Sequence, residues 1–167
     1  MIIIQDTREK IPWNFESFSE CEGQIREYVD AGDYVIQGNE QLITIDRKKS
    51  VTELANNLGI RMQRFRNEME RMQEYKYRYV VCEFPYEKLL MFPKGAGLPK
   101  TVLRKIRMKG KFLVKRMEQL SEEFGVEFVF SNNREEAQQK AIELFTKAID
   151  GEQTEDKDTD KLSTSDQ

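Results

Sequence analysis

The chain has 167 residues, 38% of them hydrophobic, which is enough to bury the core of one domain but too little for two ordinary domains. It contains no histidine, which excludes Ser-His-Asp hydrolases, HExxH zinc proteases and histidine-based nucleases, so any hydrolysis must depend on carboxylates, lysine and a bound metal ion. No apolar stretch is long enough to cross a bilayer and no charged leader precedes the first apolar run, so we expect a soluble protein of the cytoplasm.

Charge is distributed unevenly along the chain. The formal net charge is −3, but residues 150–167 hold seven acidic residues against two lysines, which leaves +2 for residues 1–149. Beyond Gly151 the sequence offers too few apolar residues to anchor it to a core. We therefore predict one domain over residues 1–150 and a disordered acidic tail over residues 151–167.

The first predicted element is a β-strand over residues 1–5, whose β-branched residues favour extended backbone. The charged run Asp6-Thr7-Arg8-Glu9 follows directly at its C-terminal end. The clearest local signal is a β-hairpin, with strands over residues 34–37 and 41–45. Its connection is Gly38-Asn39-Glu40, and Gly-Asn is a favoured pair in tight turns.

Helices and strands alternate in the rest of the chain. A capping box formed by Ser50 and Glu53 predicts a helix that ends near Gly59, and methionine and phenylalanine at three- and four-residue spacings predict a second helix after it. Together the elements predict an α/β domain with a mixed β-sheet flanked by helices. The remaining predicted elements are short strands over residues 24–28, 77–82 and 126–130, a helical segment over residues 98–124 broken at Gly110, and a final helix capped by Asn132 or Asn133.

The hairpin brings three polar residues together if its loop has an even length. With a two-residue loop Asp33 faces Thr44 and lies one diagonal step from Asp46, and with a four-residue loop Asp33 faces Asp46 directly. Lys48 shares their face because side chains alternate along a strand. A three-residue loop would place the two aspartates on opposite faces, so the prediction depends on this parity.

Such a grouping has the chemistry needed for phosphodiester hydrolysis. Two carboxylates about 5–8 Å apart repel each other unless they are neutralised, and hard oxygen ligands suit Mg²⁺ or Mn²⁺. Lys48 could orient a water or hydroxide and stabilise the charge that develops on a phosphoryl oxygen. The alternative is structural: Asp33 is a turn residue after Gly32, and residues 46–49 are a solvated strand exit.

Three ordered motifs resemble the nuclease domain of the XPF-type structure-specific endonucleases. They are Asp6-Thr7-Arg8-Glu9, Gly32-Asp33-Tyr34 and Asp46-Arg47-Lys48, where the family has Asp-x-Arg-Glu, Gly-Asp-Tyr and Glu-Arg-Lys. The resemblance covers roughly residues 1–83 and implies the restriction-endonuclease-like fold of the PD-(D/E)xK class. It also implies a metal-dependent endodeoxyribonuclease with Mg²⁺ or Mn²⁺ as cofactor, in a single-domain version that would suit a phage or a bacterium.

Two positions depart from the family pattern: Asp46 stands in place of glutamate, and Thr52, next to Glu53, stands in place of an aspartate. The tandem helix-hairpin-helix repeats that often follow this domain are also not recognisable after Glu83. The resemblance nevertheless assigns roles residue by residue. It implies that Asp6, Asp33 and Asp46 are metal ligands or lie close to the metal, that Lys48 is the catalytic lysine, and that Arg8 and Glu9 support the site.

A run rich in lysine and arginine indicates where DNA would bind. Residues 88–116 contain ten basic residues and no acidic residue, a pattern typical of sequence-independent phosphate binding, although a solvated helix face would look similar. Arginines of the second predicted helix are less informative because glutamates interleave with them. The predicted DNA-binding residues are Arg47, Arg61, Arg64, Lys100, Arg104, Lys105, Arg107, Lys109 and Lys111.

The sequence therefore predicts an endonuclease that cuts flap, fork or junction DNA in recombination, repair or phage DNA processing, inside a bacterial or phage-infected cell. Two alternatives remain open: a restriction-type nuclease of the same fold, and a DNA-binding scaffold subunit with a decayed site. Retention of Asp6, Glu9, Asp33, Asp46 and Lys48 argues against decay. A homodimer is also expected, because a lone nuclease domain has little surface with which to hold branched DNA.

Overall fold

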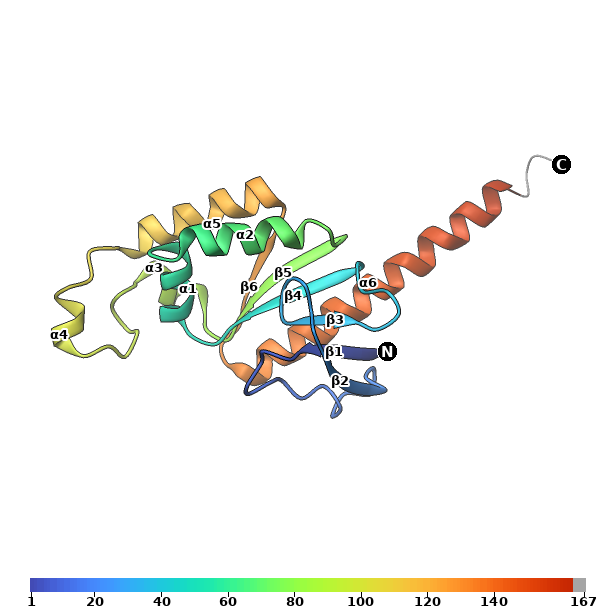
Figure 1. The fold of residues 1–167 in the computed structure, drawn as a ribbon, viewed down its shortest axis with the longest axis horizontal. Coiled ribbons are helices and arrows are strands. Elements are labelled where there is room, and N and C mark those ends of the chain that lie inside the picture. The colour runs from blue at the N-terminus through green and yellow to red at the C-terminus, as the bar shows by residue number, and fades with distance from the viewer. Residues whose placement is uncertain (164–167) are drawn as a thin grey trace.

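The computed structural model describes the backbone of residues 1–163, which forms a six-stranded mixed β-sheet with helices on both faces (Figure 1). This confirms the predicted α/β class, and the strand order is β2-β1-β3-β4-β5-β6. The strands are β1 (Ile2–Asp6), β2 (Gly23–Glu27), β3 (Tyr34–Ile36), β4 (Ile43–Lys48), β5 (Tyr77–Cys82) and β6 (Glu127–Phe130). The helices are α1 (Val51–Leu58), α2 (Met62–Met72), α3 (Tyr86–Leu90), α4 (Lys100–Leu103), α5 (Gly110–Phe124) and α6 (Arg134–Ser163).

The strand pairing decides the register that the sequence left open. Strand β3 runs antiparallel to both of its neighbours, β1 and β4, while the other three neighbouring pairs are parallel. Tyr34 pairs with Ile45, which is the register of the four-residue loop. Asp33 therefore lies opposite Asp46, in agreement with the second of the two even-length alternatives.

Hydrophobic layers cover both faces of the sheet. Helices α1, α2, α3 and α5 pack over one face, where Val80 and Cys82 are buried, and α6 packs over the other together with Trp13 and Phe15. All six residues of β4 are buried as a result. The charged residues at the end of β4 are thus enclosed, which contradicts the alternative of a solvated strand exit.

Several predicted elements occur at or near their predicted bounds. Strand β5 spans residues 77–82 as predicted. Ser50 caps α1, because its side chain accepts a hydrogen bond of 3.2 Å from the backbone N–H of Glu53. Of the two asparagines considered for α6, it is Asn133 that caps the helix, through a 2.8 Å hydrogen bond from the backbone N–H of Glu136.

The helical prediction over residues 98–124 is wrong in its first half. Only the four residues of α4 are helical before α5 begins at Gly110, and the short helix α3 was not predicted. A Cβ atom on Gly110 would lie 1.9 Å from the carbonyl oxygen of Leu90, so only glycine allows the start of α5 to approach the end of α3 this closely. In the sequence, a glycine required for close packing cannot be distinguished from one that interrupts a helix.

Helix α6 continues past the predicted domain boundary at residue 150 and extends to Ser163 (Figure 1). Lys76 supports this extension, since its Nζ lies 2.6 Å from Glu152 Oε1 and 2.7 Å from Glu155 Oε2. The helix thus continues into the segment for which we predicted a disordered tail, residues 151–167, and that disorder stays a prediction. Residues 164–167 lie outside the described part of the chain. None of the described helices is both long enough and apolar enough to span a membrane.

Candidate active site

A cleft of about 450 Å³ lies where the ends of β1 and β4 approach α1 and α2. A larger hollow of about 1,040 Å³ lies between β1, β3 and α2, but its lining contains no lysine and does not include the paired aspartates. The smaller cleft collects eight of the residues predicted from the sequence. These are Asp6, Arg8, Glu9, Asp33, Asp46, Lys48, Arg61 and Arg64.

Asp33 and Asp46 are fixed side by side at the floor of the cleft. The backbone N–H of Asp33 donates to the carbonyl oxygen of Ile45 at 2.8 Å. The backbone N–H of Arg47 in turn donates to Asp33 Oδ2 at 2.7 Å. Ile45 and Arg47 flank Asp46 in the sequence, so these two hydrogen bonds hold Asp33 next to Asp46.

Gly32 makes this approach of the two strands possible. Its φ angle is 82°, and a Cβ atom at this position would lie 2.1 Å from Thr44 Oγ1. Its backbone N–H also donates to Glu68 Oε1 at 2.8 Å. Any other residue at this position would therefore be strained and would push β3 away from β4, which explains why the aspartate follows a glycine.

The two aspartates differ electrostatically from aspartates in water. Burial raises the pKa of Asp33 well above its ordinary value, and the neighbouring charge of Asp46 adds to this. Burial also raises the pKa of Asp46, although Lys48 opposes the shift. Without a cation, the pair therefore binds protons more tightly than isolated aspartates do.

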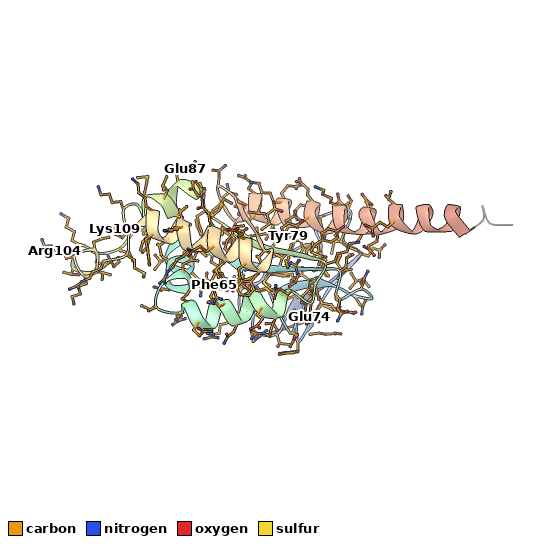
Figure 2. All side chains as sticks on the ribbon, turned by 90° about the horizontal axis from the view of Figure 1, so that it is seen from above. Phe65, Glu74, Tyr79, Glu87, Arg104 and Lys109 are labelled. Carbon is orange, nitrogen blue, oxygen red and sulfur yellow. The ribbon has the colours of Figure 1, made fainter. Side chains whose placement is uncertain are left out.

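Lys48 completes the polar group on this face of the sheet. Its Nζ lies 2.8 Å from Asp46 Oδ2 and 5.0 Å from the ring centre of Phe65, which is labelled on α2 in Figure 2. Burial by itself would lower the pKa of Lys48, but the surrounding carboxylates, Asp46 above all, outweigh it and raise the pKa. Lys48 is therefore a cation at neutral pH, suited to stabilise negative charge and unsuited to act as a general base.

The oxygen atoms of this site fit a hard divalent cation. Asp46 Oδ2 is buried and makes no hydrogen bond of normal geometry, even though Lys48 Nζ lies within ion-pair distance of it. Among the described residues, no three His, Cys, Asp or Glu side chains are arranged to hold a metal ion. Asp33 and Asp46 thus fit a cation that takes its remaining ligands from water or a phosphate group, as Mg²⁺ usually does.

Asp6 lies in the cleft but has other partners. Its Oδ2 accepts a hydrogen bond from Arg8 Nε, and its Oδ1 accepts one of 3.2 Å from the backbone N–H of Val29. Because both oxygens are engaged, Asp6 acts here by holding Arg8 at the rim, where 56% of the arginine side chain is exposed. Its predicted role as a metal ligand stays a prediction.

Arg47 faces the opposite side of β4, and its predicted contact with DNA is wrong. Only 1% of its side chain is exposed. Its Nε donates to Glu83 Oε1 at 2.7 Å, its Nη1 donates to Glu9 Oε2 at 3.0 Å, and its guanidinium lies 5.1 Å from the ring centre of Trp13. The alternation of side chains along a strand is the reason, since it turns Arg47 away from the cleft that its two neighbours face.

Replacing Arg47 by methionine is expected to lower the free energy of unfolding by about 3 kcal/mol, because it removes the buried cation shared by the largely buried carboxylates of Glu9 and Glu83. Glu9 then keeps its ion pair with Lys49, and Glu83 keeps its hydrogen bond from the indole N–H of Trp13. Urea denaturation at neutral pH measures this loss. Arg64→Met, at an exposed position on the rim of the cleft, serves as the matched control and is expected to change stability by less than about 0.5 kcal/mol. Equal stabilities of the two variants would show that the Arg47 network contributes nothing.

Sequence reasoning missed Glu68 as a residue of the cleft. The sequence interpretation paired the glutamates of α2 with nearby arginines, and Glu68 does form an ion pair with Arg71. The other carboxylate oxygen of Glu68 accepts the hydrogen bond from the backbone N–H of Gly32, which the sequence did not indicate. The spacing contained a signal: Glu68 lies three residues after the buried Phe65, next to the apolar stripe of the helix. Glu53 and Asn57 of α1 also line the cleft, and Asn57 Oδ1 is buried without a hydrogen-bond partner.

The predicted basic surface lies on a projecting segment, here called the basic arm and defined as residues 93–109. Figure 1 shows α4 at the end of this arm, and Figure 2 shows Arg104 and Lys109 at the end of the molecule opposite the free end of α6. Its base lies beside the cleft, because Met108 packs so closely on Gly59 that a Cβ there would lie 2.1 Å from Met108 Cε. The exposed predicted residues on or next to the arm are Lys100, Arg104, Lys105, Arg107, Lys109 and Lys111.

Comparisons with known proteins support the fold. No family model and no curated protein sequence matches the chain. One similar solved structure is XPF from Aeropyrum pernix, with 18% identity and a TM-score of 0.60 over 85% of this chain and 63% of that one. Another is XPF from Aeropyrum pernix in complex with DNA, with 17% identity and a TM-score of 0.58 over 87% of this chain and 65% of that one. The chain thus matches less than two thirds of the length of those structures, and it has the XPF-like nuclease fold that its three motifs predicted.

Proposed function

We propose that this protein is a metal-dependent endonuclease that hydrolyses phosphodiester bonds in DNA. The observation that carries the proposal is the enclosed pair Asp33 and Asp46 with the cationic Lys48 at 2.8 Å from Asp46, at the floor of an open cleft. The shared fold is consistent with it, since one of the similar XPF structures was solved with DNA.

The residues of the cleft divide the chemistry among them. Bound to Asp33 and Asp46, Mg²⁺ or Mn²⁺ would supply Lewis-acid activation of water and of the scissile phosphate. Lys48 would donate a hydrogen bond to a phosphoryl oxygen and stabilise the negative charge that grows there. Burial raises the pKa of both Asp33 and Asp46, so a bound cation would compete with protons for their oxygen atoms.

Charge around the cleft favours one path for the DNA. On one side, the larger hollow is lined by five carboxylates (Glu27, Asp30, Glu40, Glu70 and Glu74), which repel phosphates. On the other side lie Arg61 and Arg64 at the rim and then the basic arm. We therefore propose that the DNA backbone leaves the cleft toward the arm.

Branched DNA, such as a flap, fork or junction, is the proposed substrate, with a restriction-type nuclease of the same fold as the second candidate. The catalytic groups of these two classes are shared, and only the DNA contacts distinguish them. The scaffold alternative is disfavoured because all the predicted catalytic side chains lie in or directly behind one cleft. A homodimer stays a prediction that light scattering of the purified chain tests.

A cleavage panel of duplex, single-stranded, flap, fork and four-way-junction DNA tests the proposal. We expect cleavage with Mg²⁺ or Mn²⁺ and none with a chelator, and faster cleavage of branched than of plain duplex DNA. Cleavage of duplex at specific sequences would favour the restriction-type candidate. Absence of cleavage of every DNA with either metal would contradict the proposed function.

A further inference from the structure

At the base of the basic arm lies an apolar groove that the proposed chemistry does not use. The groove has a volume of about 740 Å³ and lies between the end of α3, the start of α5 and the residue Leu103 of α4. Two of its apolar side chains are unusually open to solvent, with Leu90 42% and Met91 57% exposed. Its lining consists of Leu90, Met91, Phe92, Pro93, Leu103 and Gly110, with Lys94, Lys109 and Lys111 at its edges.

Every charged residue that lines the groove is a lysine. Residues 88–116 contain no acidic residue, and the three lysines of the groove are exposed. Within the described part of the chain, none of these three lysine side chains forms an ion pair or a side-chain hydrogen bond with the protein. An occupant of the groove must therefore bring negative charge as well as apolar surface.

Unpaired nucleotides meet both requirements. Each nucleotide carries one negative phosphate and one base whose flat faces are apolar, and single strands bind proteins by placing bases on apolar side chains while lysines contact the backbone. A duplex presents its phosphates equally well, but its base faces are stacked inside the helix and cannot enter a groove. The combination of an apolar floor and a basic edge thus favours a single strand over a duplex.

The groove lies close enough in the fold to the cleft for one branched DNA to contact both. Met108 packs against Gly59, and Gly59 lies two residues before Arg61 at the rim of the cleft. The backbone N–H of Gly110 donates to the carbonyl oxygen of Phe92 at 2.9 Å, which ties the floor of the groove to the start of α5. The groove is therefore anchored to the same body that holds the cleft.

We propose that this groove is a binding site for the unpaired strand of branched DNA, with Leu90 and Met91 against the bases and Lys94, Lys109 and Lys111 on the phosphates. The inference rests on the proposed function for its choice of nucleic acid. It identifies the part of the molecule that distinguishes branched from plain duplex DNA. A strand held in the groove would place the neighbouring duplex at the cleft.

Fluorescence anisotropy of the full chain with labelled oligo(dT) and with a duplex of equal length tests the site, in the presence of a chelator so that no cleavage occurs. The double variant Leu90→Ser/Met91→Ser is expected to weaken binding of oligo(dT) by about tenfold and to leave duplex binding unchanged. The dependence of its affinity on salt should stay the same, because no phosphate contact is lost. Lys109→Gln is expected to weaken binding of both DNAs and to reduce the salt slope by about one.

Val102→Ser is the matched control. Val102 is 41% exposed on the same arm but does not line the groove, so its variant is expected to bind both DNAs like the parent chain. Circular dichroism establishes that each variant is folded, which is expected because the replaced side chains are exposed. A second probe, 2-aminopurine within the oligo(dT), should change its fluorescence on binding to the parent chain and not to the double variant.

Equal loss of oligo(dT) and duplex binding in the double variant, or no loss at all, would overturn the proposal. The proposal would also be overturned if the double variant bound DNA normally but no longer bound vesicles of anionic lipid. That result would assign the exposed apolar residues to a membrane surface. The binding assay is independent of catalysis, so a protein that cleaves no DNA can still show the groove effect. A protein that cleaves branched DNA but shows no groove effect would refute only the groove.

Discussion

Replacement of Lys48 by methionine is expected to reduce the cleavage rate by about 10²–10³-fold, the loss typical when one stabilising donor for a developing oxyanion is removed. Methionine has a similar volume and an apolar chain, so the packing on Phe65 is kept while the charge 2.8 Å from Asp46 is lost. The raised pKa of Lys48 keeps the wild-type side chain cationic throughout the neutral range, so the variant loses a full positive charge from the cleft. Single-turnover cleavage at saturating enzyme measures the rate.

The matched control is Lys115→Met on α5, an exposed lysine outside the cleft, for which we expect an unchanged rate. Binding of DNA measured in a chelator should be unaffected in Lys48→Met, because the lysine is buried and does not lie at the rim. Alanine is a poorer choice at this position, since it would also open a cavity beneath a buried carboxylate. A rate equal to that of the wild type would remove Lys48 from the reaction.

Asp33→Asn is expected to abolish cleavage and, without divalent cations, to raise the free energy of unfolding by about 1 kcal/mol. Asparagine keeps an oxygen that can accept the hydrogen bond from the backbone N–H of Arg47, and it removes a buried charge next to Asp46. Adding Mg²⁺ or Mn²⁺ should stabilise the wild type and not the variant, because ligands stabilise only the state that binds them. Thermal unfolding with a chelator and with each metal measures both effects.

The gain in stability depends on pH in a direction that the raised pKa determines. The folded wild type holds the proton of Asp33 more tightly than the unfolded chain does, so protonation stabilises it as the pH falls through the raised pKa. The stability difference between variant and wild type in a chelator is therefore largest at high pH and disappears at low pH. Asp30→Asn, at an exposed aspartate outside the cleft, is the matched control. A destabilised Asp33→Asn at high pH would contradict the assignment of Asp33 to a strained carboxylate pair.

Local patterns predicted the parts of the fold that local forces control. The capping box at Ser50, the strand at residues 77–82 and the β3–β4 hairpin depend on neighbours a few residues apart, and the structure confirms all three. The helical prediction over residues 98–124 failed in its first half, and Gly110 begins α5 in contact with Leu90, twenty residues earlier, instead of joining two helices. Contacts of that range leave no periodic trace in the sequence.

The candidate site shows the same division. Asp33, Asp46 and Lys48 were placed on one face by the alternation of a β-strand, which is a local rule, and only the loop length remained open. Glu68 is held in the cleft by a contact with the distant Gly32, and sequence reasoning missed it. Arg47 is held in the core by a contact with the distant Glu83, and sequence reasoning placed it on the DNA surface.

The sequence by itself determined which groups are available for chemistry: carboxylates and one lysine on neighbouring strands, no histidine, and a basic segment without acids. Only the tertiary structure decided which of these groups meet. Burial of β4 on both faces turned the Asp46 face into the floor of an open cleft and the Arg47 face into core, and α2 brought Glu68 to the hairpin. The reason is physical, because residue type and spacing set local geometry, whereas burial and the pKa values that follow from it depend on everything packed around a side chain.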